Sequence, residues 1–175
     1  MKARSRRVKG ALFEREVAAL LLKLLGPPFT KKDCFRTPMS GGHRFASKSD
    51  LTVSKRLTDV FPFAVECKHQ KTFIPEILFS GTKLIESWCE QSVRATAKNR
   101  LFPMVVMKGN RTAVFVALST EVLKDTRVKD LPAAEFELSK RQPHAIVYYC
   151  QRYWRVYRWD KFCKAADRAI ARLRN

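Results

Sequence analysis

Hydrophobic residues recur along residues 9–25 at the spacing of one face of an α-helix, and Gly26-Pro27-Pro28 then predicts its end. Placing the residues at about 100° intervals gives one broad apolar face. That face contains Phe13, Val17, Leu20, Leu21, Leu24 and Leu25. Glu14 falls inside the apolar sector, whereas Glu16 lies off its edge. We therefore expect Glu14 to be the carboxylate of this helix that points into the protein.

Short apolar runs predict three strands after this helix, near residues 33–37, 50–53 and 62–69. The third run ends in Glu66-Cys67-Lys68. Because a strand alternates its faces residue by residue, Glu66 and Lys68 are expected on one face and Cys67 on the other. A carboxylate and an ammonium group are thus predicted side by side at the end of a strand.

The remaining pattern predicts a second helix over 81–100, a hairpin of 103–108 and 112–118, and an irregular segment over 119–143. Gln91 and Ser92 share the apolar face of the second helix, so an amide is expected to point towards the sheet. Residues 145–158 predict one or two strands, and 160–174 a final helix. This order of elements indicates a mixed α/β domain.

The chain is strongly basic. It contains 35 Lys and Arg but only 16 Asp and Glu, which gives a net charge of +19. Such a chain is suited to a polyanion, and nucleic acid is the partner that we predict. A membrane surface is disfavoured, since there is neither a lipidation signal nor an apolar run of transmembrane length. We expect an intracellular, cytoplasmic protein.

Several other kinds of site are disfavoured by the sequence. The cysteines and the three histidines are scattered without the spacing of a zinc site. Gly41-Gly42 does not belong to a nucleotide-binding fingerprint, so no nucleotide cofactor is expected.

The acidic residues indicate a site for a divalent metal ion. Glu14, Asp50 and Glu66 are hard oxygen ligands of the kind that Mg²⁺ takes, and the Cys67 carbonyl is a further candidate ligand. Lys68 is a candidate to orient water or to neutralise a phosphate, and Gln91 to hold either of them from the helix behind. The pattern therefore predicts metal-dependent phosphodiester hydrolysis.

Structural explanations stand beside each of these assignments. A glutamate in a helix is commonly a solvated ion-pair partner, and Asp50 follows a turn-like Ser47-Lys48-Ser49. Glu66 and Lys68 are also consistent with an exposed pair on one strand, and Gln91 with a satisfied core amide. It is their joint occurrence in this order of elements that favours a site.

Three motifs resemble those of known nucleases. The stretch KGALFERE over residues 9–16 resembles the opening helix of the archaeal-type Holliday-junction resolvases, in which K-G-x-x-x-E-R-E is characteristic. Ser40-Gly41-Gly42 resembles their glycine-rich loop. Asp50 with Glu66-Cys67-Lys68 resembles the D…E-x-K core of the PD-(D/E)xK nuclease superfamily. The resemblance runs from about residue 9 to residue 118.

The resemblance implies a restriction-endonuclease-like α/β core with a central mixed sheet flanked by helices. Glu14, Asp50 and Glu66 would bind Mg²⁺, for which Mn²⁺ would substitute, Lys68 would be catalytic, and Ser40 would approach the DNA. A homodimer that cuts four-way junctions is also implied. Ser49 stands where the superfamily often has proline, and the tail over 145–175 has no counterpart. The compact size and this tail favour a phage origin, with the host cytoplasm as location.

We accordingly divide a single domain into a basic arm over 1–8, a nuclease core over 9–118 and a C-terminal strand and helix extension over 119–175. Further DNA contacts are expected from basic or polar residues in the arm and around the site. These are Arg7, Lys9, Arg44, Lys48 and His69. Two rival functions remain open, a restriction- or repair-type nuclease and a basic nucleic-acid-binding protein without activity.

Overall fold

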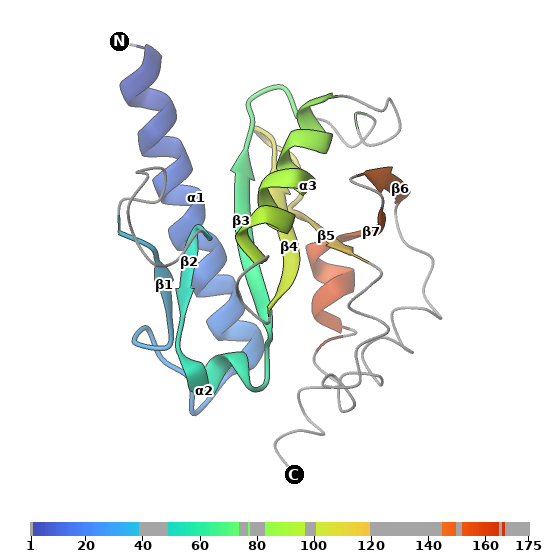
Figure 1. Cartoon of the computed structure of the whole chain (residues 1–175). Helices are drawn as coiled ribbons and strands as arrows, with labels where there is room; N and C mark the ends of the chain where they lie inside the picture. The colour runs from blue at the N-terminus through green and yellow to red at the C-terminus, as the bar shows by residue number, and fades with distance from the viewer. Residues whose placement is uncertain are drawn as a thin grey trace.

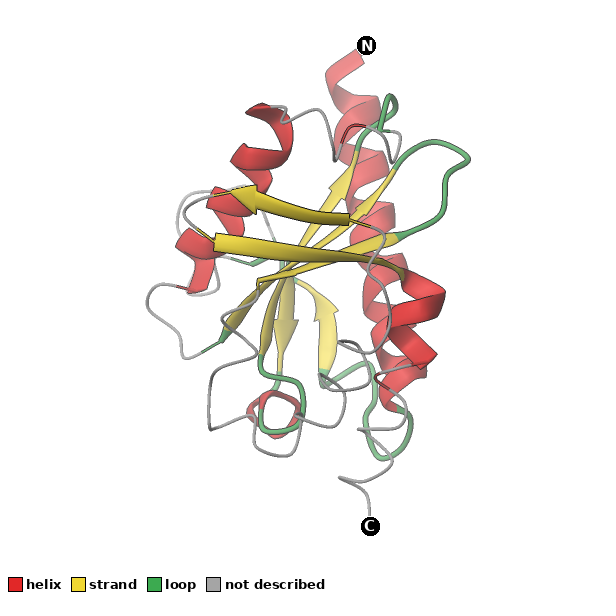
Figure 2. Cartoon of the chain, turned by 90° about the vertical axis from the view of Figure 1, so that its right-hand side faces the viewer, coloured by secondary structure: helices red, strands yellow, loops and turns green. Residues whose placement is uncertain are grey.

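A five-stranded mixed sheet with helices on both sides forms the centre of the computed structural model (Figures 1 and 2). The structure describes residues 2–38, 49–73, 77, 83–96, 101–119, 145–149, 152–164 and 166. The predicted α/β class is confirmed. The helices are α1 (Lys2–Leu25), α2 (Lys55–Thr58) and α3 (Lys83–Thr96). The strands are β1 (Cys34–Arg36), β2 (Leu51–Val53), β3 (Phe63–His69), β4 (Phe102–Lys108), β5 (Phe115–Ser119), β6 (Ala145–Tyr149) and β7 (Arg152–Arg158).

Helix α1 ends where the sequence predicts but begins earlier, because residues 2–8 continue it instead of forming a separate arm. Gly26 adopts φ 63°, and its N–H donates to the Leu22 carbonyl at 2.9 Å. A glycine takes this left-handed conformation at little cost and so terminates the helix. The first turn carries no acidic residue. Its positive charge therefore opposes the helix dipole, which favours a negative partner near this end.

The strand order in the large sheet is β3-β4-β5-β7-β6. Strands β3 and β4 are parallel and are connected through α3, and every other pair is antiparallel. The predicted hairpin is confirmed, since Met104 of β4 lies opposite Leu118 of β5. The C-terminal tail forms two strands, and β7 pairs with β5 from Trp154 to Arg158. Part of the expected extension is therefore built into the central sheet.

Two hydrophobic clusters fill the two faces of this sheet. The cluster on the α1 face also receives the helix over residues 159–164, and the other cluster lies under α3. Alternation decides the assignment: Val65 and Cys67 of β3 belong to the α1 side, and Val105 of β4, which pairs with Glu66, belongs to the α3 side. Glu66 therefore emerges on the α3 face. No described helix is long and apolar enough to cross a membrane.

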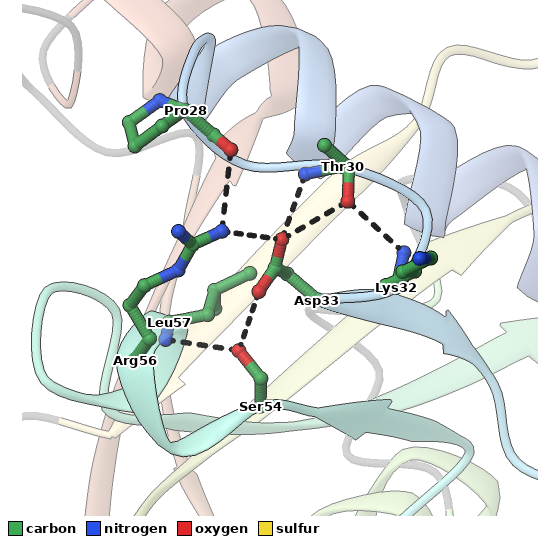
Figure 3. Close-up of polar contacts among 7 residues, drawn as sticks. All are labelled: Pro28, Thr30, Lys32, Asp33, Ser54, Arg56 and Leu57. Atoms are coloured by element: carbon green, nitrogen blue, oxygen red, sulfur yellow. Dashed lines mark hydrogen bonds and ion pairs between the residues drawn. The ribbon is translucent and has the colours of Figure 1, made fainter.

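A small antiparallel hairpin of β1 and β2 lies beside the large sheet, with Phe35 opposite Thr52. Asp33 ties its two ends together (Figure 3). The Asp33 carboxylate accepts hydrogen bonds from the Thr30 N–H at 2.9 Å, the Ser54 hydroxyl at 2.9 Å and the Arg56 guanidinium at 2.8 Å. These bonds, the Thr30 N–H first among them, lower the Asp33 pKa to about 2. The network fixes the hairpin from which Asp50 approaches the sheet.

Replacing Asp33 by asparagine is expected to lower the melting temperature at neutral pH, because an amide nitrogen cannot accept these bonds. The depressed pKa places this stabilisation above about pH 4 and removes it as the pH falls towards 2. Thermal melts of parent and variant between pH 7 and pH 2 should therefore converge at the acidic end. Asp59→Asn, at the exposed aspartate that follows α2, is the control and should melt like the parent. Equal melting of Asp33→Asn at pH 7 would contradict the structural role.

Candidate functional site

Glu66 is the centre of a polar cluster at the end of β3. Its side chain is only 1% exposed, and its Oε1 lies 2.6 Å from the Lys68 Nζ. Gln91 of α3 bonds both partners: its Oε1 accepts from the Lys68 Nζ at 2.8 Å, and its Nε2 donates to the Glu66 Oε1. The three side chains thus form a closed triangle of hydrogen bonds. The predicted inward orientation of the Gln91 amide is confirmed.

The local fold explains why these residues meet. Alternation along β3 puts Glu66 and Lys68 on the α3 face and turns Cys67 into the apolar cluster with Val65 on the other side. Helix α3 packs its buried residues, among them Trp88 and Ser92, against the sheet. Gln91 lies between these positions at the edge of the buried face, so its stem is exposed while its amide reaches Glu66.

Asp50 reaches the same strand from the small hairpin. Its backbone N–H donates to the Val65 carbonyl at 3.2 Å, and its Oδ2 accepts from the Cys67 N–H at 2.8 Å. Because the N–H and C=O of one strand residue point to the same edge, the Cys67 carbonyl also points towards Asp50. Two carboxylates and one carbonyl therefore gather at this edge of β3.

Asp50 and Glu66 repel each other when both carboxylates are ionised. The pKa of Glu66 is raised to about 8, first by burial and then by the negative charge of Asp50, with Lys68 offsetting part of the effect. In addition, the Glu66 Oε2 is buried and makes no hydrogen bond to any described residue. A buried carboxylate oxygen without a donor is costly, so a positive charge at this point would be strongly stabilising.

This donor set fits a divalent cation. Mg²⁺ accepts one or two carboxylates together with waters and carbonyl oxygens, and Asp50, Glu66 and the Cys67 carbonyl offer that combination. Among the described residues no group of three or more His, Cys, Asp or Glu side chains lies close enough to hold an ion together. The protein would therefore supply two carboxylates, and water or substrate oxygens would supply the remaining ligands.

Glu14 is buried, as the helical spacing predicts, and its carboxylate forms an ion pair. Its Oε2 lies 2.6 Å from the Arg36 Nε of β1. Glu14 still contributes, with Asp50 and Glu66, to the raised pKa of the Cys67 thiol, for which burial is the main cause. Arg36 does not figure in the sequence prediction. The available signal is its position two residues after buried Cys34, which puts both side chains on the same face of β1.

The DNA-binding candidates divide into two groups. Arg7 and Lys9 are exposed on α1, and the His69 ring packs at 5.8 Å from the ring of Phe13. Burial and then the charges of Lys108 and Lys9 lower the His69 pKa. The second group, Ser40, Arg44 and Lys48, lies outside the described residues.

Lys108 is a basic residue near these positions that the sequence prediction omits. Its Nζ lies 2.7 Å from the exposed Glu16 and 5.9 Å from the centroid of the Phe13 ring. The pairing of β3 with β4 puts Lys108 opposite His69. Knowledge of this parallel register would have been needed to place it, and the sequence alone does not supply that register.

Comparison with known proteins gives one family match. A family model described as "Phage putative PDDEXK endonuclease" matches residues 5–169, which include Glu14, Asp50, Glu66, Lys68 and Gln91. No curated protein and no solved structure matches the sequence significantly. Nucleases of the PDDEXK type generally use divalent metal ions, in agreement with the oxygen ligands gathered at β3. Because the match spans most of the chain, this protein belongs to the phage PDDEXK endonuclease family, within the PD-(D/E)xK nuclease superfamily.

Proposed function

We propose that the protein is a metal-dependent DNA endonuclease that resolves four-way junctions. The observation that carries the nuclease assignment is the pairing of Asp50 with Glu66 beside Lys68. One buried carboxylate oxygen there lacks a partner among the described residues. Family membership supports the same reaction type. The junction as substrate rests on the resemblance of residues 9–16 and of Ser40-Gly41-Gly42 to the resolvases.

In this mechanism Asp50, Glu66 and the Cys67 carbonyl would hold the metal ion. When bound, Mg²⁺, or Mn²⁺ in its place, supplies a Lewis acid for the phosphate and lowers the pKa of a water molecule. Glu14, whose Oε2 forms an ion pair with Arg36, would add a third negative charge beside Cys67. The buried position of Glu66 keeps bulk water away from one side of the site, which strengthens each electrostatic contact.

The ammonium group of Lys68 is positioned to face the reacting phosphate. Its Nζ is held by Glu66 and Gln91, and its side chain is 17% exposed, so the ammonium group is positioned yet open towards a ligand. There it can orient the attacking water or neutralise the charge that develops on the phosphate oxygens. Gln91 acts as a positioning residue that keeps the ammonium group in place.

Gln91→Ala is expected to slow cleavage about tenfold, because one hydrogen bond to a charged group is lost while the ligands remain. The measurement is the single-turnover rate on a labelled DNA substrate in saturating Mg²⁺. Glu90→Gln, at the preceding exposed position of α3, is the control and should retain the parent rate. An unchanged rate for Gln91→Ala would remove the positioning role.

The test of substrate choice compares a four-way junction, a flap and a linear duplex that share the same arms. With Mg²⁺, the junction should be nicked symmetrically in two opposed strands, whereas the flap and duplex should remain intact. Two opposed cuts require two active sites, so a homodimer is expected in solution. Cleavage of duplex or flap at a comparable rate would replace the junction assignment with a restriction- or repair-type nuclease. Salt-sensitive binding without any divalent-dependent cleavage would indicate a binding protein instead.

A further inference from the structure

Two exposed tyrosines form a pair on the β6–β7 hairpin, far along the sheet from Glu66. Tyr148 and Tyr153 are each 58% exposed, and they are the most exposed large hydrophobic side chains among the described residues. They lie directly opposite each other in the strand register, with ring centroids 4.9 Å apart and planes tilted by 57°. Neither ring belongs to either core cluster. The pair presents aromatic surface that the fold itself does not cover.

Strand alternation explains this exposure. On β7, Trp154 and Val156 enter the cluster under α3, so Tyr153 and Arg155 face the other side. On that side the last buried residue of β7 is Tyr157, which belongs to the same cluster as Phe162 from the helix over residues 159–164. The tyrosine pair lies beyond this covered part, next to Arg155 on the same face.

The charge of the hairpin indicates what the pair would bind. Residues 145–158 contain Arg152, Arg155 and Arg158 and no acidic residue. A positively charged strand with exposed aromatic rings combines the two features by which proteins hold single-stranded nucleic acid: base stacking and backbone attraction. An interface between two copies of the chain would instead bring the arginines of both hairpins together, at an electrostatic cost.

We propose that Tyr148 and Tyr153 form a stacking site for unpaired nucleobases of single-stranded DNA, with Arg155 attracting the phosphate backbone. The site is separate from the cleavage centre. In the order β3-β4-β5-β7-β6 the hairpin is at the opposite end of the sheet from β3 (Figure 1). At about 4.8 Å per strand this corresponds to roughly 20 Å, and the rings emerge on the face opposite to Glu66. Binding at this site therefore does not require the metal or the catalytic residues.

The test is fluorescence anisotropy with a labelled single-stranded oligothymidine and with a labelled duplex, in EDTA. Tyr148→Ala and Tyr153→Ala should each weaken single-strand binding about tenfold, the loss typical of one stacked base, and change duplex binding less than twofold. Tyr148→Phe and Tyr153→Phe keep the rings and should bind like the parent. Phe35→Ala, at an exposed aromatic residue of β1, is the matched control and should also bind like the parent.

Since EDTA removes divalent ions, the result is independent of whether the protein cleaves DNA. Parent-like single-strand binding by both alanine variants would overturn the proposal. So would an equal loss on duplex, which would indicate general charge effects, or a shift from dimer to monomer with unchanged DNA affinity, which would make the pair an interface between copies. If an alanine variant does not fold by circular dichroism, Tyr→Leu at the same position keeps apolar bulk without a ring and should show the same tenfold loss.

Discussion

Asp50→Asn is expected to reduce Mg²⁺-dependent DNA cleavage by about 1,000-fold or more, since it removes one of the two carboxylates proposed to hold the metal. The amide oxygen of asparagine can still accept the hydrogen bond from the Cys67 N–H, which is 2.8 Å from Asp50 in the parent. The hairpin should therefore stay docked. Removing the Asp50 charge also relieves Glu66, whose pKa that charge raises. The variant should thus be inactive without being less stable.

The measurement for Asp50→Asn is a single-turnover cleavage assay with matched thermal melts. DNA affinity measured in EDTA serves as the internal control and should match that of the parent. Asp59→Asn is the control variant, because it removes an exposed aspartate of the neighbouring segment and leaves the site untouched. A cleavage rate within tenfold of the parent would exclude Asp50 as a metal ligand.

Glu66→Gln should raise the stability of the metal-free protein, and the gain should grow with pH. The Glu66 pKa is raised from 4.5 to about 8, so the folded chain holds this proton more tightly than the unfolded chain does. Parent stability therefore falls as the pH rises through this interval, whereas the amide does not titrate. One pKa unit corresponds to about 1.4 kcal/mol, so the whole shift is worth a few kcal/mol. The variant should melt roughly 5 °C or more above the parent at pH 9, and the gap should narrow by pH 5.

Metal addition provides the complementary test. Mg²⁺ should raise the melting temperature of the parent and should have little effect on Glu66→Gln, because the ion favours the ionised carboxylate. The Mg²⁺ effect on the parent should also increase between pH 6 and pH 9, as the proton on Glu66 becomes easier to displace. If the melting temperature of the parent changes with neither pH nor Mg²⁺ in this range, Glu66 is not the proposed ligand.

Short-range patterns were sufficient to predict much of the site. The 3.6-residue period places Glu14 inside and Glu16 outside, and the two-residue period puts Glu66 and Lys68 on one face with Cys67 behind. The same periods predict the amide of Gln91 facing the sheet. These features depend only on neighbours along the chain, so the sequence contains them.

Features that depend on long-range pairing could not be predicted in the same way. The ion pair of Glu14 with Arg36 needs the packing of α1 on β1, and the position of Lys108 needs the parallel register of β3 with β4. The pairing of β7 with β5 is equally invisible to local patterns, so the tail reads as an appendage although Trp154 is fully buried. The sequence also did not predict that α1 begins at Lys2, because residues 2–8 are mostly charged and show no apolar helical period.

The pairing of β7 with β5 has a consequence for synthesis on the ribosome. Every residue proposed for catalysis precedes residue 92, yet β5 gains its outer neighbour only when residues 152–158 have emerged. Until then β5 is an unprotected edge, and the cluster under α3 lacks Trp154 and Val156. A nascent chain would therefore carry its complete catalytic set before it has a stable sheet. In a chain under synthesis, cutting activity would thus await the emergence of β7.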